Sequence, residues 1–188
     1  MRRLAVAFCV VVSIVLSGCA AVVVGGAGAG VVAAEDRRSI GTQTEDEGIE
    51  FKVSGRVSDT HKDRVHLNVT SYNRMVLLTG EVPNEKVRED IARIARAVEN
   101  VRGVTNELTV GTPTTLSNRA NDTYVTSKVK ARFVDAQRFN PIHVKVVTEN
   151  QVAYLLGLVK KQEAKDAVEL ARTTDGVKKV VTVFEYLD

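Results

Sequence analysis

The chain has 188 residues, of which 44% are hydrophobic and 26% are charged, so it is not wholly disordered and fits one medium domain or two small ones. Its two cysteines exclude a disulfide framework of the small secreted type. Aromatic residues make up only 5% of the chain, which predicts a core of aliphatic side chains. The formal net charge of +3 favours an anionic partner.

Residues 1–18 have the features of a lipoprotein signal peptide. Arg2 and Arg3 form a basic start, and the apolar run 4–16 is too short for an ordinary membrane span. The sequence LSGC at 16–19 then resembles the bacterial lipobox. That resemblance implies cleavage before Cys19 and covalent attachment of diacylglycerol and an N-acyl chain, such as palmitate, to this residue. An ordinary signal peptide with a chance cysteine is the alternative.

Cleavage would leave a mature chain without a free thiol, because Cys9 departs with the signal and Cys19 becomes a thioether. Ala20 follows Cys19, whereas in lipoproteins of this kind Asp at that place retains the protein at the inner membrane. The resemblance therefore implies an outer-membrane location, lipid-anchored and facing the periplasm. Residues 19–43 are predicted to be a lipidated tether and linker. Their glycine run 25–30 lacks the Lys-Ser/Thr that a phosphate-binding loop requires.

The rest of the chain contains one unit twice, predicted to occupy residues 44–111 and 112–188. The two copies align at offsets of 76 and 77 residues. The matched pairs include Ile49 with Val125, Val53 with Val129, His66 with His143, Asn73 with Asn150, and Gly80 with Gly157.

Each copy predicts the same order of elements. In the first, apolar residues at helical spacing around 49–57 precede a β-hairpin turning at Asn73-Arg74, a helix opening near Asn84, and a final strand over 104–110. In the second, helices are predicted near 122–134 and 162–173, with a hairpin at Asn150-Gln151 and a strand ending near Tyr186. The order αββαβ predicts an α+β fold, with two helices covering one face of a three-stranded sheet.

This unit resembles the BON domain, a small module of bacterial periplasmic and outer-membrane proteins. The resemblance is carried by VLLTGEV at 76–82 and VRGVTN at 101–106, and by YLLGLV at 154–159 and GVKKV at 176–180. With the lipobox, the tether, and the stretch 117–130, the whole chain is similar to dual-BON outer-membrane lipoproteins. This resemblance implies a role in outer-membrane integrity and enrichment at the division site. It also implies binding of anionic phospholipid, of phosphatidylglycerol or cardiolipin type, through the first helix of the second unit.

The residues of that helix are compatible with lipid binding. Val125, Val129 and Phe133 share one stripe, which predicts the core face. Tyr124 lies roughly opposite, where its apolar ring and polar hydroxyl suit a membrane interface, although the family commonly carries Trp there. The candidate phospholipid-binding residues are Tyr124, Ser127, Lys128, Lys130, Ala131, Arg132 and Val134. The alternative is that Tyr124 packs against the other unit.

The first unit provides an internal comparison. Gly48 stands where Tyr124 stands in the second unit, and Ser58 stands where Val134 does. Residues 44–111 carry ten basic and twelve acidic side chains, whereas 112–188 carry twelve and nine. An anionic surface is therefore predicted to meet the second unit, not the first.

The sequence predicts neither an enzyme nor a metalloprotein. His66 and His143 occupy equivalent places in the two units, which indicates a structural role, and a site using both would need the units to converge. No nucleophile pattern or RNA-binding signature is present in the sequence, so we expect no catalytic residue, no metal, no further cofactor and no nucleic-acid partner. The alternative function is a periplasmic interaction module that binds an envelope assembly factor, a protease, a division-site protein or a peptidoglycan-associated partner.

Overall fold

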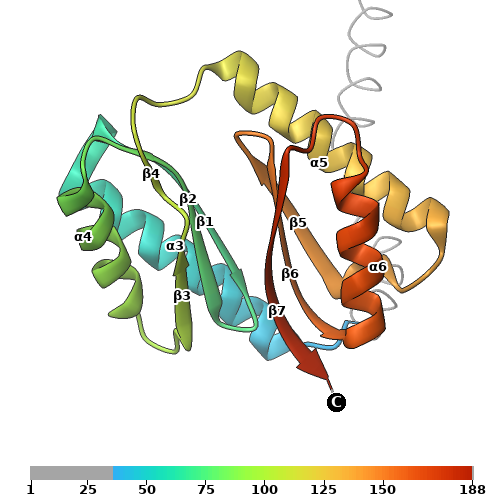
Figure 1. Cartoon of the computed structure of the whole chain (residues 1–188). Coiled ribbons are helices and arrows are strands. Elements are labelled where there is room, and N and C mark those ends of the chain that lie inside the picture. The colour runs from blue at the N-terminus through green and yellow to red at the C-terminus, as the bar shows by residue number, and fades with distance from the viewer. Residues whose placement is uncertain (1–35, 188) are drawn as a thin grey trace, which may run out of the picture. The chain divides into compact units, whose positions relative to one another are not determined.

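The computed structural model describes residues 36–187 (Figure 1). The elements of the first repeat are α3 (Ile40–His61), η2 (Lys62–Arg64), β1 (His66–Tyr72), β2 (Met75–Val82), α4 (Glu85–Arg96), β3 (Gly103–Asn106) and β4 (Thr109–Val110). Those of the second repeat are α5 (Leu116–Ala136), η3 (Pro141–His143), β5 (Val144–Glu149), β6 (Val152–Lys160), α6 (Lys161–Arg172) and β7 (Lys179–Leu187). The predicted signal peptide, Cys19 and the tether up to residue 35 lie outside the described residues.

The two long helices begin in the same way. The Ser39 hydroxyl caps α3 and the Thr115 hydroxyl caps α5, each accepting a hydrogen bond from the backbone N–H three residues later. Both helices begin before the first of their regularly spaced buried residues, because their first turns lie outside the core. Ile40 and Leu116, the first residue of each helix, are 69% and 80% exposed. Helix α3 therefore includes residues 40–43, which the sequence analysis assigned to the linker.

Both predicted hairpins are confirmed. Strands β1 and β2 pair antiparallel, as do β5 and β6. The turn residues Asn73 and Arg74 have φ of 51° and 65°, and their counterparts Asn150 and Gln151 have φ of 50° and 64°. Two consecutive residues of positive φ are typical of the type I′ turn, whose twist matches that of the flanking strands.

The α+β fold class is confirmed in both repeats. The middle strand of each sheet is the second hairpin strand, which pairs parallel with the strand that follows the second helix. In the first repeat the predicted final strand is interrupted between β3 and β4, and both pieces pair with β2. The Asn106 side chain accepts a hydrogen bond from the Leu108 backbone N–H, and this local turn breaks the strand.

Two helices cover one face of each sheet (Figure 1). In the first repeat, Val76, Leu78 and Val82 of β2 pack in one buried cluster with Ile49 and Val53 of α3. In the second repeat an equivalent cluster includes Val129, Phe133, Leu155 and Val159. Alternate residues of a strand point to opposite faces, so these clusters use only one face of each sheet.

The opposite faces of the two sheets share a third buried cluster. Leu77 and Tyr72 of the first repeat belong to it together with Tyr154 and Leu156 of the second. Polar contacts between the repeats include a 2.8 Å ion pair between Lys145 and Glu50 and a 2.8 Å hydrogen bond from Asn73 to Glu185. Each repeat thus covers the sheet face that its own helices leave open.

A repeated glycine brings each hairpin strand close to its partner. An added Cβ on Gly80 would lie 2.1 Å from the carbonyl oxygen of His66, and one on Gly157 would lie 2.4 Å from that of His143. No side chain fits at such distances from backbone atoms, so both positions require glycine. Within residues 36–187, no helix has the length and apolar character needed to cross a membrane.

Candidate functional site

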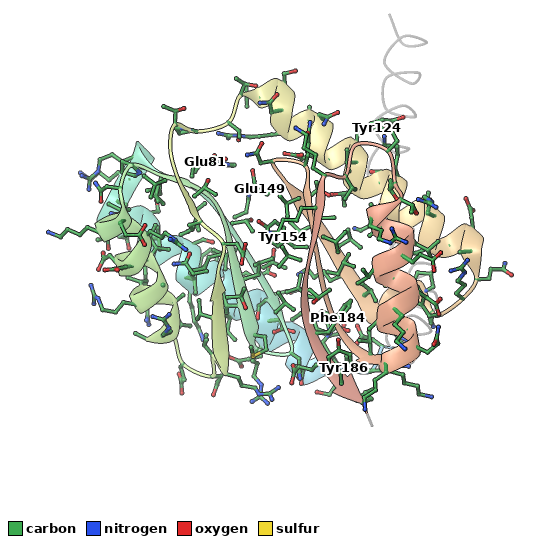
Figure 2. All side chains as sticks on the ribbon, viewed as in Figure 1. Glu81, Tyr124, Glu149, Tyr154, Phe184 and Tyr186 are labelled. Carbon is green, nitrogen blue, oxygen red and sulfur yellow. The ribbon has the colours of Figure 1, made fainter. Side chains whose placement is uncertain are left out.

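Helix α5 carries all of the predicted phospholipid-binding residues. Val125, Val129 and Phe133 are at most 1% exposed, which confirms them as its core face. Tyr124 is 62% exposed and Val134 is 59% exposed, so neither packs into a core of the described structure. Figure 2 shows Tyr124 projecting outward from α5, away from both sheets.

The exposed residues form a continuous strip. At 3.6 residues per turn, Tyr124, Ala131, Ser127 and Val134 fall within an arc of about 80°. The side chains of Ser127, Lys130 and Ala131 are all exposed, and that of Lys128 is half-buried. Lys128 lies at one edge of the arc and Lys130 at the other. The α5 strip, meaning Tyr124, Ser127, Ala131 and Val134, is therefore a weakly apolar surface between two lysines.

Lys128 is held in place by two neighbours. Its Nζ lies 2.9 Å from the Asp175 carboxylate and 4.9 Å from the centre of the Tyr124 ring. The hydrogen bond from Lys128 holds the pKa of Asp175 below its usual value. The ion pair offsets part of the lysine charge, while the cation–π contact orients the tyrosine ring.

Arg132 has a structural role. Its Nη1 donates hydrogen bonds of 2.9 Å to the Leu170 carbonyl, 2.9 Å to the Thr173 hydroxyl and 3.1 Å to the Thr174 hydroxyl. These groups lie at the carboxyl end of α6, where a cation satisfies carbonyls left without a helical partner. Arg132 thus fastens α5 to α6. Among the described residues, Lys130 is the predicted cation of the site with neither an ion pair nor a hydrogen bond from its side chain.

A residue outside the predicted site fixes the orientation of α5. Asp122 is only 4% exposed, and its carboxylate accepts hydrogen bonds of 2.9 Å from the backbone N–H groups of Asn150 and Gln151. Asp46 occupies the equivalent place 76 residues earlier and accepts from Asn73 and Arg74 in the same way. The recurrence of Asp at the offset of the repeat is the sequence signal that marks this role.

The first repeat also exposes an apolar side chain on its long helix. Phe51 of α3 is 81% exposed, and it lies between Gly48 and Gly55, at which an added Cβ would meet only open space. Phe51 was not among the predicted site residues, because the predicted contrast between the two helices rested on Gly48 and Ser58. The two long helices therefore both carry an exposed aromatic residue, but at different positions.

A second polar site lies between the repeats. The imidazole Nδ1 of His66 lies 2.9 Å from Oε2 of Glu81 and 3.9 Å from Oε1 of Glu149. Both carboxylates are buried, at 4% and 6% exposed, and Figure 2 shows them near each other. Burial raises the pKa of Glu149, although a hydrogen bond from Asn68 opposes this shift.

Residues 45–112 and 121–188 each match the BON domain, so the chain belongs to the BON domain family. It is 41% identical over 179 residues to the outer membrane lipoprotein DolP of Haemophilus influenzae, covering 94% of this chain and 92% of that protein. It is 32% identical over 154 residues to a 21 kDa hemolysin of Actinobacillus pleuropneumoniae, covering 81% and 79%. It is also 30% identical over 145 residues to osmotically-inducible protein Y of Escherichia coli, covering 75% and 72%.

These similarities confirm the resemblance to dual-BON lipoproteins. The match to DolP extends over nearly the whole of both chains and supports an outer-membrane lipoprotein with two BON domains.

Proposed function

We propose that this chain is a non-enzymatic protein, lipid-anchored at Cys19 to the outer membrane and facing the periplasm, that docks α5 on anionic phospholipid. The observation that carries the proposal is the α5 strip, in which Tyr124 and Val134 are 62% and 59% exposed between two lysines. The relatives named above are a lipoprotein, a hemolysin and an osmotically inducible protein, and none of these names describes an enzyme.

The energetics of docking follow from three contributions. Tyr124 and Val134 enter the headgroup region, and Tyr is suited to that depth because only its hydroxyl needs water. Lys130 contributes about 1 kcal/mol near an anionic surface. Lys128 contributes less than this, because Asp175 is already its partner.

The anchor and the helix act together. Acyl chains on Cys19 hold the protein at the membrane, so α5 meets the lipid surface at a high effective concentration. A weak helix contact is then sufficient to orient the domains and to respond to lipid composition. Phosphatidylglycerol and cardiolipin carry negatively charged headgroups and are therefore the proposed ligands.

The proposal is tested with protein lacking the acyl chains. It should sediment with vesicles containing phosphatidylglycerol and not with vesicles of phosphatidylcholine alone, and salt should weaken the binding. Tyr124→Glu should abolish binding while the circular dichroism spectrum stays unchanged. Phe51→Glu, which alters the exposed aromatic residue of α3, is the matched control and should bind as the wild type does. Normal binding by Tyr124→Glu would show that the site is wrong.

The exposure of Phe51 favours a second candidate function, that of a periplasmic interaction module. Phe51 is 81% exposed between two glycines whose surroundings are open, so it can serve as an aromatic anchor for an envelope protein as partner. A photo-crosslinking residue at position 51 should then capture a defined envelope protein in cells. If it captures none while α5 binds lipid, the lipid proposal stands alone.

The proposed roles in outer-membrane integrity and at the division site rest on the family resemblance. Cells lacking the protein should become sensitive to detergents that an intact outer membrane excludes. A fluorescent fusion should concentrate at the division site, and Tyr124→Glu should spread it evenly over the envelope. Even distribution of the wild-type fusion would contradict the division-site role.

A further inference from the structure

We propose that His66, Glu81 and Glu149 bind a divalent metal ion of the Zn²⁺ type, which joins the two BON domains. One ligand atom from each of these side chains lies within 4.8 Å of the other two. Zinc ligands lie about 2.0–2.2 Å from the ion, so small side-chain movements would bring the three atoms into coordination. His66 and Glu81 belong to the first domain and Glu149 to the second.

Each carboxylate has one oxygen available to a cation. Oε2 of Glu81 accepts hydrogen bonds from His66 and from the backbone and hydroxyl of Thr114. Oε2 of Glu149 accepts one from Asn68. Among residues 36–187, the remaining oxygen of each carboxylate accepts no hydrogen bond, although both side chains are more than nine-tenths buried. Neither oxygen is sealed from solvent, so a metal ion that enters the site can reach both of them.

The charges around the site also favour a divalent ion. Two carboxylate side chains face one imidazole here, so acidic groups outnumber basic groups among the three ligands. A divalent cation with a neutral imidazole would balance both carboxylates. Arg119 also lines the cleft, but among the described residues it forms no ion pair with either carboxylate, and its Nε donates to the Thr114 hydroxyl at 3.4 Å. By contrast, the buried carboxylate of Asp46 has its own cation, Arg38, at 3.0 Å.

The three residues are not a by-product of the internal repeat. The counterpart of Glu81 at the offset of 77 residues is Leu158, and the counterpart of Glu149 is Tyr72. Only His66 has an equivalent, His143. The two carboxylates are therefore residues in which the repeats differ, and they meet where the two domains are in contact.

A cleft gives access to this cluster. It has a volume of about 320 Å³, and its lining includes His66, Asn68, Thr126 and Glu149. The cleft provides a path for the ion and room for the water that would complete a tetrahedral site.

The test uses the mature chain without an affinity tag, purified in a non-ionic detergent and stripped of metal with a chelator. Calorimetric titration with ZnCl₂ should give one ion per chain, and binding should raise the melting temperature, because the ion joins both domains. CoCl₂ should give visible absorption bands of tetrahedral coordination. MgCl₂ should bind far more weakly, because Mg²⁺ prefers oxygen ligands and octahedral geometry.

Two variants locate the site. Glu149→Gln removes one ligand and also one buried charge, so the metal-free variant should keep its fold while losing at least tenfold in zinc affinity. His66→Gln should lose affinity to a similar extent. His61→Gln is the matched control, because His61 is also buried but faces a single carboxylate, Asp90, at 2.9 Å. Absence of stoichiometric zinc binding, or unchanged binding in Glu149→Gln with a normal circular dichroism spectrum, would overturn the proposal.

Discussion

The buried carboxylate of Asp122 accepts a hydrogen bond of 2.9 Å from the backbone N–H of Asn150. This contact fastens α5 to the tip of the β5–β6 hairpin and fixes the rotation of the helix about its axis. Tyr124, two residues further along α5, is consequently turned away from the sheet. The proposed lipid surface thus depends on a hydrogen bond inside the domain.

Replacement of Asp122 by Ala should destabilise the protein by about 2–4 kcal/mol, because two backbone N–H groups at the hairpin lose a charged acceptor. Asp135→Ala is the control, since Asp135 lies exposed on the same helix. Denaturation with urea measures both variants. Equal stabilities would mean that the hydrogen bonds of Asp122 contribute nothing to the fold.

The bidentate contact between Arg37 and Glu163 should make stability depend on acid pH. Hydrogen bonds from the guanidinium, at 2.6 and 2.8 Å, lower the pKa of Glu163 to about 2, from an ordinary value of 4.5. A lowered pKa in the folded state stabilises the protein above pH 4.5, and this stabilisation is lost as the pH falls toward 2. An NMR titration of the Glu163 carboxyl carbon should follow this low pKa.

Arg37→Ala should raise the pKa of Glu163 toward its ordinary value and make stability less dependent on acid pH. Arg138→Ala serves as the control, because Arg138 pairs with Asp166 and Glu169 instead. If the Glu163 carboxyl of the wild type titrates near pH 4.5, the contact with Arg37 does not lower its pKa.

The shared cluster between the sheets should couple the unfolding of the two domains. Leu77 is 1% exposed within this cluster, so Leu77→Ala should cost about 2–5 kcal/mol through lost burial and a cavity. Leu116→Ala, at a residue 80% exposed, should change stability by less than about 0.5 kcal/mol. Calorimetry should show a single transition for the wild type, and an unaltered transition in Leu77→Ala would argue against the coupling.

Asp135 should weaken lipid binding, because its exposed carboxylate lies at the edge of the α5 strip, between Tyr124 and Lys128. Asp135→Asn removes a charge that an anionic membrane repels, at a gain of about 1 kcal/mol or roughly fivefold in affinity. Vesicle titration at low salt measures the change. Asp59→Asn, an exposed acidic residue near the end of α3, should leave the affinity unaltered.

Much of the fold could be predicted because it depends on local patterns. The offset of the repeat identified two equivalent units, and Asn at each hairpin turn indicated the positive φ that both turns adopt. The buried stripe of Val125, Val129 and Phe133 was visible at helical spacing. The starts of α3 and α5 were missed because their first turns are exposed and carry no such pattern.

Contacts between distant residues were beyond the reach of these patterns. Arg132 was selected as a cation for lipid, but its role at the end of α6 depends on residues about forty positions away. The approach of Glu149 to His66 requires the two domains to meet, which neither repeat encodes alone. The hydrogen bonds from the hairpin to Asp122 could have been predicted, because Asp46 stands at the equivalent place in the first repeat and accepts the same hydrogen bonds.

The most direct test of lipid docking is a residue-resolved NMR titration of protein lacking the acyl chains with phosphatidylglycerol micelles. Docking through α5 should place the largest shifts on the exposed residues of this helix, from Tyr124 to Val134. The exposed face of α3 around Phe51 should not shift. Shifts centred on α3, or equal shifts with phosphatidylcholine micelles, would contradict docking of α5 on anionic lipid.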